Sequence, residues 1–244
     1  MLLAAGRGER MRPLTDTTPK PLLRVQGQPL LHWHLAALAA GGVEKVLINT
    51  AWLGTQISGC FGHQFGLQPL SGKRRQLSIL YSHEGLDFGA ALETAGGIAR
   101  ALPQLAEVFW LAAGDVFAPD FVFAAQAVQA FAASDQLAHL WLVPNPAHHP
   151  RGDFGLSPQG LALNLPDLDP APRYTYSTIG LYRKALFAPP WCDLPAGNPQ
   201  GVAAPLGALL RRAMDAGRVS AALYHGRWTD VGTPERLAAL QAGS

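Results

Sequence analysis

Long apolar runs alternate with amphipathic segments over the first 145 residues of the chain. The apolar runs predict buried strands over residues 1–5, 45–49, 77–82, 108–114 and 138–143. Between them, helical periodicity predicts three helices, over residues 29–41, 92–102 and 119–134. Because a parallel sheet built from such alternation is buried on both faces, the order predicts an α/β fold with a mostly parallel sheet between helices.

The first predicted helix carries the clearest local signals. Leu31, Leu35 and Leu38 share one face, with Pro29 suited to the first turn and Gly41 to the stop. By the same argument the third helix should begin at Pro119, because a proline in the first turn loses no helical hydrogen bond.

The pattern changes after about residue 145. Residues 152–165 read as two short strands around a Ser-Pro-Gln-Gly turn, and residues 174–182 read as another strand. A helix over residues 204–217, a further strand and a last helix capped at Thr233 and Pro234 complete the chain. This half predicts a smaller α+β lobe on the same sheet. Residues 68–76, "QPLSGKRRQ", read as a solvated loop insertion.

Composition narrows the class of partner. The 244 residues are 48% hydrophobic and 15% charged, with a formal net charge of +2, and no run of five like charges occurs. These values favour one compact domain with a small anionic substrate and no nucleic acid. No stretch approaches the roughly 18 apolar residues of a membrane span. Cys60 and Cys192 are isolated, which suits a reducing cytoplasm and predicts neither a disulfide nor a thiolate metal site.

The opening loop, residues 6–20, is rich in glycine, proline and cations. Gly6 and Gly8 supply two glycines of a dinucleotide fingerprint, but Met11 stands where the third should be, and Pro13 forbids an immediate helix. The Gly-Lys-Ser/Thr of a P-loop is also absent. The remaining choices are an exposed turn and a loop whose backbone N–H groups cradle phosphate oxygens.

Two cations favour the phosphate-binding interpretation. Arg10 offers a rigid fork of donors, and Lys20 offers a point charge between Pro19 and Pro21, which restrict the backbone. Read whole, the string L-A-A-G-x-G-x-R-M-x-P-L-T followed by P-K-P-L, within residues 3–22, resembles the signature of the sugar-1-phosphate nucleotidylyltransferases.

The resemblance implies a Rossmann-like, three-layer fold of the nucleotide-diphospho-sugar transferase type in a single domain of residues 1–244. Residues 1–145 would form the nucleotide-binding half and residues 146–244 the sugar-binding half. It implies UTP and a sugar 1-phosphate as substrates, with Arg10 and Lys20 as catalytic residues. The nucleotide-binding residues that it implies are Ala4, Ala5, Gly6, Gly8, Glu9, Arg10, Lys20, Glu84 and Gly97.

Two aspartates could complete such a site. Asp115 ends a buried parallel strand, at the edge where open α/β sheets bind ligands, and Asp230 lies between the last strand and a capped helix. Two polyanionic substrates require charge screening, which Mg²⁺ held by carboxylates provides. Taken alone, either residue could equally be a turn or cap aspartate. The family resemblance, through Gly-Asp and W-x-D-x-G-T, implies that both hold magnesium.

The sugar-binding residues implied by the resemblance are Asn145, Asp153, Ser177 and Gly180. His148 and His149 are read as loop residues, because adjacent histidines do not direct both rings at one metal. Two alternatives stay open. One is transfer to another sugar or from another base, as in mannose-1-phosphate guanylyltransferases or the glucose-1-phosphate thymidylyl- and uridylyltransferases. The other is a non-catalytic nucleotide-binding regulatory subunit.

Overall fold

The computed structural model describes residues 1–67 and 75–242, and two compact units can be distinguished in it. Unit 1 comprises Met1–Glu93, Ala112–Ala125 and Arg227–Ser244, and unit 2 comprises Thr94–Leu111 and Gln126–Gly226. The predicted division near residue 145 does not follow these bounds, and its assignment to nucleotide and sugar stays a prediction. Most of the predicted insertion, residues 68–74, lies outside the described residues.

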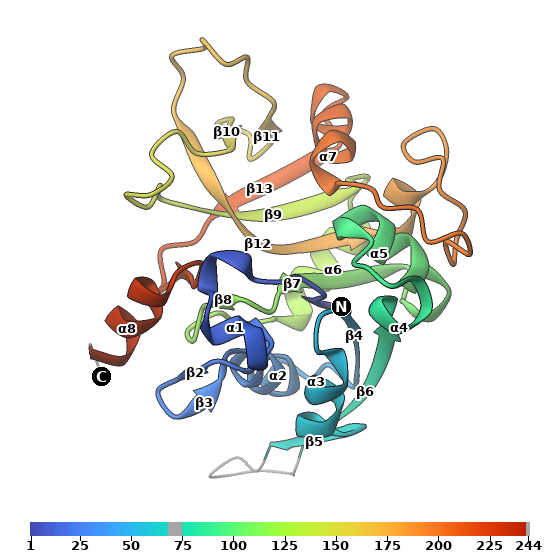
Figure 1. Cartoon of the computed structure of the whole chain (residues 1–244). Coiled ribbons are helices and arrows are strands. Elements are labelled where there is room, and N and C mark those ends of the chain that lie inside the picture. The colour runs from blue at the N-terminus through green and yellow to red at the C-terminus, as the bar shows by residue number, and fades with distance from the viewer. Residues whose placement is uncertain (68–74, 243–244) are drawn as a thin grey trace. The chain divides into compact units, whose positions relative to one another are not determined.

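A parallel sheet forms the centre of unit 1 (Figure 1). Strand β1 pairs in parallel with β4 on one side and with the end of β7 on the other, and β4 pairs in parallel with β6. Strand β5 is antiparallel to β6, and β2–β3 and β14–β8 form two small antiparallel pairs. The strands are β1 (Leu2–Ala4), β2 (Arg24–Val25), β3 (Gln28–Pro29), β4 (Lys45–Thr50), β5 (Gln64–Leu67), β6 (Arg75–His83), β7 (Val108–Ala113), β8 (Val116–Phe117) and β14 (Thr229–Asp230).

Helix α2 shows how the sequence of unit 1 specifies its core. It runs over Leu30–Ala40 and ends at Gly41, and its three predicted face residues are buried, with Leu31 and Leu35 fully so. Burial of each such leucine contributes about 1.5–3 kcal/mol to folding. The other helical segments of unit 1 are η1 (Glu9–Met11), α1 (Leu14–Thr17), η2 (Lys20–Leu22), α3 (Gly54–Phe61), α4 (Glu84–Phe88) and α8 (Pro234–Ala242).

Unit 2 is built around β9, which pairs antiparallel with β12 and parallel with β13. Strand β10 joins β12 and β11 joins β10, both antiparallel. The elements are α5 (Glu93–Ala101), η3 (Leu102–Gln104), α6 (Ala125–Ala133), β9 (Ala138–Val143), β10 (Phe154–Leu156), β11 (Ala162–Leu163), β12 (Arg173–Arg183), η4 (Lys184–Phe187), α7 (Leu206–Asp215) and β13 (Val219–Leu223).

The helix predicted to begin at Pro119 was placed too early, since α6 begins at Ala125. Phe121 and Phe123 are buried, whereas Val122 between them is 71% exposed, so this segment buries every second residue, as extended chain does. The segment packs closely on the end of α2. A Cβ on Gly41 would lie 2.2 Å from the carbonyl oxygen of Phe123, which makes glycine necessary there. Helices α3 and α4 were not predicted.

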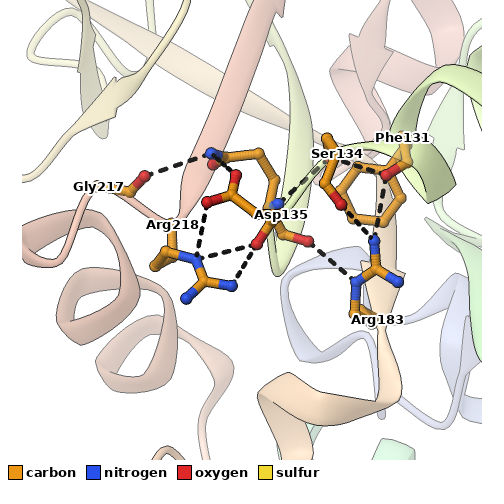
Figure 2. Close-up of polar contacts among 7 residues, drawn as sticks. Phe131, Ser134, Asp135, Arg183, Gly217 and Arg218 are labelled. Atoms are coloured by element: carbon orange, nitrogen blue, oxygen red, sulfur yellow. Dashed lines mark hydrogen bonds and ion pairs between the residues drawn. The ribbon is translucent and has the colours of Figure 1, made fainter.

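Two arginines fasten the end of α6 in unit 2 (Figure 2). Arg183 donates to the carbonyl oxygens of Phe131 and Ser134 at 3.2 and 3.0 Å. It also donates to the carbonyl oxygen of Ala132 at 3.3 Å and, through Nε, to that of Gln136 at 3.2 Å. Arg218 donates to the carbonyl oxygen of Asp135. Phe131 and Ala132 lie in the last turn of α6, whose carbonyls have no partner within the helix, and Ser134, Asp135 and Gln136 follow it, so the two guanidinium groups bind the backbone at and just after the helix end. We call this group, Arg183 and Arg218 with residues 131–136, the α6 collar.

Among the residues that the structure describes, no helix is both long enough and apolar enough to cross a membrane.

Candidate active site

Asp115 lies in the turn between β7 and β8 of unit 1, and this turn is held from two sides. The backbone N–H of Gly114 donates to the carbonyl oxygen of Leu3 at 2.8 Å, and a Cβ on Gly114 would lie 2.9 Å from Leu31 Cδ1. On the other side, His34 Nε2 lies 2.8 Å from the carbonyl oxygen of Val116. Burial lowers the pKa of His34, so the neutral ring can donate to this carbonyl.

Asp230 reaches Asp115 through the short antiparallel pair β14–β8. Asp230 is the register partner of Val116, and the backbone N–H of Val231 donates to the carbonyl oxygen of Asp115 at 3.1 Å. Backbone pairing therefore brings together two carboxylates that are far apart in the sequence.

Lys20 places its ammonium beside both carboxylates. Its Nζ lies 2.5 Å from Asp115 Oδ2 and 4.0 Å from Asp230 Oδ1. The lysine side chain is only 9% exposed, whereas that of Asp115 is 38% exposed. A nearly buried ammonium requires such partners, because leaving it unpaired would cost several kcal/mol of desolvation. Asp115 Oδ1 has no hydrogen-bond partner among the described residues.

Arg236 is a fourth member of this group, and the sequence analysis missed it. Its Nη1 donates to Asp230 Oδ2 at 2.8 Å and to the Asp230 carbonyl oxygen at 2.9 Å. A Cβ on Gly232 would lie 2.6 Å from Arg236 Nη2, so glycine leaves room for the guanidinium. A cation in the first turn of α8 opposes the helix dipole, and that signal could have revealed it. We call Lys20, Asp115, Asp230 and Arg236 the carboxylate cluster.

The opening loop presents Arg10 to solvent. Arg10 lies in η1, and its neighbour Met11 is fully buried and anchors that turn. Gly8, directly before η1, has a φ of +68°, which favours glycine. Within the part of the chain that is described, the Arg10 guanidinium makes no hydrogen bond or ion pair, so it remains available to an anion.

The other predicted nucleotide-binding residues near the N-terminus differ in solvent exposure. Ala4 and Ala5 are buried, and the Ala4 N–H donates to Asn49 Oδ1 at 3.0 Å. Gly6 and Glu9 are exposed, and a Cβ on Gly6 would meet no atom within 4 Å. Backbone groups of this loop are thus open to a ligand at Gly6, while the end of β1 is not.

Glu84 is fully buried and both of its oxygens accept hydrogen bonds within unit 1. Oε1 accepts from Asn49 Nδ2 and Oε2 from the Leu92 N–H, each at 2.8 Å. These bonds join β4, α4 and the segment before α5, so any direct contact of Glu84 with a nucleotide stays a prediction. Gly97 is buried in α5 of unit 2.

The sugar-binding candidates gather along one stretch of β12 in unit 2. Asn145 donates to the Arg173 carbonyl oxygen at 3.0 Å and accepts from Thr175 Oγ1 at 2.9 Å. Asp153 Oδ2 accepts from the Tyr176 N–H at 2.8 Å, and its Oδ1 lies 3.1 Å from His149 Nε2. The polar atoms of both candidates therefore have partners inside the unit, and their contact with a sugar stays a prediction.

Ser177 and Gly180 flank an irregularity in β12. The register with β9 shifts between Tyr176 and Gly180, and Thr178 there has a φ of +62°. Ser177 is buried and its Oγ donates to the Trp141 carbonyl oxygen at 2.6 Å. Bulges with strained residues often adjoin functional sites, so Thr178 is a position that the sequence analysis missed.

Among the described residues, no group of three or more His, Cys, Asp or Glu side chains could hold a metal ion. The acidic pair Asp115 and Asp230 therefore provides at most two protein carboxylates at one point. Hard oxygen ligands in this number suit Mg²⁺, which keeps water or phosphate oxygens as its remaining ligands.

A parallel sheet with a glycine-rich loop after its first strand, and with carboxylates at strand ends, is an arrangement suited to binding phosphates. A family model described as "Nucleotidyl transferase" matches residues 1–243, and the chain belongs to this family. The resemblance seen in residues 3–22 is thereby confirmed.

The similarity to particular members extends over the whole chain. This chain is 44% identical over 244 residues to N-acetylmuramate alpha-1-phosphate uridylyltransferase of Neisseria meningitidis serogroup B, and the alignment covers 99% of this chain and 96% of that protein. A Caulobacter vibrioides protein of the same name is 29% identical, with 99% and 95% covered.

Solved structures support the fold. A structure from Bacillus anthracis assigned as a glucose-1-phosphate thymidylyltransferase matches with a TM-score of 0.75 at 19% identity, covering 99% of this chain and 92% of that chain. The inositol-1-phosphate CTP transferase from T. maritima matches at 0.66 and 18%, with 99% and 95% covered. The predicted α/β fold with a mixed, mostly parallel sheet is confirmed.

Proposed function

We propose that the protein transfers a uridylyl group from UTP to N-acetylmuramate 1-phosphate, giving UDP-N-acetylmuramate and pyrophosphate in the recycling of peptidoglycan sugars. The observation that carries this proposal is the 44% identity over nearly the full length of both chains. Five strings, "INTAWLG", "YSHEG", "LETAGGI", "NPAHHPRGDF" and "YHGRWTDVGTPERL", resemble this branch of the family.

The chemistry requires positioning and charge neutralisation more than covalent catalysis. An oxygen of the sugar phosphate attacks the α-phosphorus of UTP in line, the bond to the β-phosphate oxygen breaks, and pyrophosphate leaves. Arg10, which has no partner among the described residues, stabilises the departing pyrophosphate. Lys20 neutralises charge at the reacting phosphates. Each such contact can lower the barrier by about 2–4 kcal/mol, judged from oxyanion-donor deletions.

Asp115 and Asp230 would hold Mg²⁺ in this proposal. Both carboxylates lie beside the Lys20 ammonium, at 2.5 and 4.0 Å, and Asp115 Oδ1, which has no partner among the described residues, could bind the ion. Magnesium would supply charge screening between the two phosphate groups. Arg236 fixes the rotamer of Asp230 through Oδ2 and leaves Oδ1 directed toward Lys20.

Selectivity for muramate requires a group that reads its lactyl carboxylate. A guanidinium fork is best suited to this, and Arg151 and Arg173 lie nearest the proposed sugar-binding residues in the sequence. Arg173 donates to the backbone carbonyls of Leu165 and Pro166. The side chain of Arg151 is 76% exposed, and its Nη2 lies 3.9 Å from Asp167 Oδ1, which is a long and exposed ion pair. Arg151 is therefore the better candidate.

The test is a pyrophosphate-release assay with UTP and N-acetylmuramate 1-phosphate, with and without Mg²⁺. ATP, CTP, GTP and dTTP are run beside UTP, and glucose, mannose and N-acetylglucosamine 1-phosphates beside the muramate. Release confined to UTP, muramate and magnesium supports the proposal. Preference for another base or sugar would assign the chain to a different specificity, and no release with any pair would favour a regulatory subunit.

A single variant sharpens the sugar assignment. Arg151→Met should lower kcat/KM for the muramate substrate by about 10- to 100-fold, the scale of a charge-assisted hydrogen bond. Activity with N-acetylglucosamine 1-phosphate should stay nearly unchanged. Equal losses on both substrates would show that Arg151 does not read the lactyl group.

A further inference from the structure

Arg7 lies in the opening loop, yet its guanidinium is engaged inside unit 1. Its Cζ lies 3.7 Å from the centroid of the Trp52 ring, so the planar cation stacks on the indole face. Its Nη1 donates to the Thr15 carbonyl oxygen at 2.8 Å, and its Nη2 donates to Asp16 Oδ1 at 3.0 Å. The arginine is thus held by a ring, a carbonyl and a carboxylate at once.

Trp52 binds the same loop through its edge as well. Its Nε1–H donates to the Thr15 carbonyl oxygen at 2.9 Å, so this oxygen accepts from both the arginine and the indole. Trp52 belongs to the connection between β4 and α3, and from α3 Gln56 donates to the Thr17 carbonyl oxygen at 3.0 Å. A rigid part of unit 1 therefore holds the loop from residue 7 to residue 17.

Thr15 carries these restraints on toward the carboxylate cluster. It is fully buried, and its Oγ1 donates to the carbonyl oxygen of Gly8 at 2.8 Å. A Cβ on Gly8 would lie 3.1 Å from Thr15 Cγ2 and 3.3 Å from Lys20 Cβ, so these three residues are in close packing. A continuous set of contacts consequently links the Trp52 indole to the side chain of Lys20.

We propose that Arg7 and Trp52 form a clamp that holds the opening loop in its phosphate-binding conformation before any nucleotide arrives, which makes both positioning residues. The inference rests on the proposed function, since it assigns the loop to the triphosphate. The clamp, defined as Arg7, Thr15, Asp16 and Trp52, binds no substrate atom itself. Its effect is preorganisation, because a loop already ordered costs nothing further to order on binding.

The clamp depends on the shape of arginine and not on its charge alone. A planar guanidinium can stack on a ring and still direct two N–H groups at different acceptors, whereas an ammonium cannot do both. Arg12 provides a matched control within the same loop. Its Nε also donates to Asp16 Oδ1, at 2.7 Å, and its hydrogen bond, followed by that of Arg7, lowers the pKa of the Asp16 carboxyl. Its side chain is 60% exposed.

The first experiment measures amide hydrogen exchange of the full-length protein without substrate. Trp52→Leu and Arg7→Lys should increase the exchange rates of amides in residues 8–17 by about 10-fold or more, while the amides of β4 and β6 keep their protection. Trp52→Phe, which keeps a ring face and loses the Nε1–H, should give a smaller increase. Arg12→Lys should leave the loop as in the wild type.

The second experiment measures initial rates with UTP and N-acetylmuramate 1-phosphate. If only a fraction of the variant molecules has an ordered loop, the apparent affinity for UTP falls by that fraction. Trp52→Leu should therefore raise KM for UTP by about 10-fold with kcat within about 2-fold, and Arg12→Lys should change neither.

Unchanged exchange in Trp52→Leu, or a loss of kcat at constant KM, would overturn the clamp. A loss of protection over the whole of unit 1 would also count against it, because the residue would then be structural in general. The exchange readout is independent of substrate. If the wild type is inactive with UTP and the muramate phosphate, the proposed function fails while the exchange data still decide on the clamp.

Discussion

The carboxylate cluster of unit 1 and the α6 collar of unit 2 use the same guanidinium chemistry for different ends. In the cluster, Arg236 binds one oxygen of Asp230, and the other oxygen points toward Lys20 at 4.0 Å. In the collar, Arg183 donates to four backbone carbonyls at and just after the end of α6, of which Figure 2 shows those of Phe131 and Ser134. One arginine binds a carboxylate beside an ammonium, whereas the other binds backbone carbonyls around a helix end.

The difference teaches how to separate a site from a structural network. Both groups contain arginines and aspartates, so residue type does not distinguish them. What distinguishes them is how the carboxylates are placed. In the cluster two carboxylates lie beside one ammonium, and Asp115 Oδ1 has no partner among the described residues. The collar has a single carboxylate, Asp135, and its arginines donate mainly to backbone carbonyls. Paired carboxylates at a strand end can bind a cation, whereas arginines that bind backbone carbonyls stabilise the fold.

The largest effect is expected when the carboxylate charge is removed. Asp115→Asn and Asp230→Asn should each lower turnover by roughly 100-fold or more. A neutral amide binds Mg²⁺ more weakly than a carboxylate, so the phosphate charges would be screened poorly. Steady-state rates at saturating magnesium, with circular dichroism as the fold control, measure this. Full activity in either variant would remove that residue from the metal site and weaken the contrast with the collar.

Substitutions of Lys20 and of Asp115 should differ in their effect on the free energy of unfolding. Lys20→Met should lower kcat about 10- to 100-fold and change stability little, because the Asp115 carboxylate it leaves is well exposed. Asp115→Asn instead leaves a nearly buried ammonium with a weaker acceptor, which should cost about 1–3 kcal/mol. Denaturant unfolding of the two variants compares these costs. A larger stability loss in Lys20→Met would reverse the argument.

Arg236 should act on activity through Asp230. Arg236→Met removes the hydrogen bond to Asp230 Oδ2. A carboxylate held less firmly should lower kcat/KM by roughly 10-fold and raise the magnesium concentration needed for half activity. Magnesium titration of the rate is the measurement. Arg236→Lys should recover part of the loss, because an ammonium can still reach one oxygen. A rate loss independent of magnesium would make the residue structural.

The collar should show the opposite behaviour. Arg183→Met removes donors from several helix-end carbonyls and should lower the free energy of unfolding by about 1–3 kcal/mol. Its kcat and KM should stay within about 2-fold of the wild type. Arg218→Gln, which affects a single carbonyl, should cost less. A selective loss of turnover in either collar variant would show that arginines bound to backbone carbonyls also contribute to activity. That result would contradict the distinction between the cluster and the collar.

The sequence was sufficient for the fold because strands and helices have distinct periods. The run at 45–49 and the face of α2 predicted burial correctly, which needs no knowledge of partners. The run at 77–82 forms a strand as predicted, but Leu80 in it is 39% exposed, so that strand is not buried throughout. The prediction that a helix begins at Pro119 was wrong, because a proline followed by apolar residues is also typical of an extended segment. Residues 119–124 form such a segment, and it packs on Gly41.

The site was only partly predictable. Lys20, Asp115 and Asp230 stand out by motif, and their roles stay predictions. Arg236 did not stand out, because its partner is defined by the turn at Gly232 and not by spacing. The stacking of Arg7 on Trp52 joins residues 45 positions apart, and no local pattern reports such a contact. Motifs in the sequence therefore identify the candidate site residues more readily than the residues that position them.

The pairing of β14 with β8 has a consequence for how the protein is made. Asp115 is synthesised well before its partner strand β14, which follows about 10 s later at ordinary elongation rates. During that interval the nascent chain can form β1, β4 and β7, but the cluster lacks both Asp230 and Arg236. If the cluster acts as proposed, a nascent chain would therefore be inactive until Asp230 and Arg236 have emerged, and a chain clipped before residue 227 would lose both residues while keeping most of its sheet.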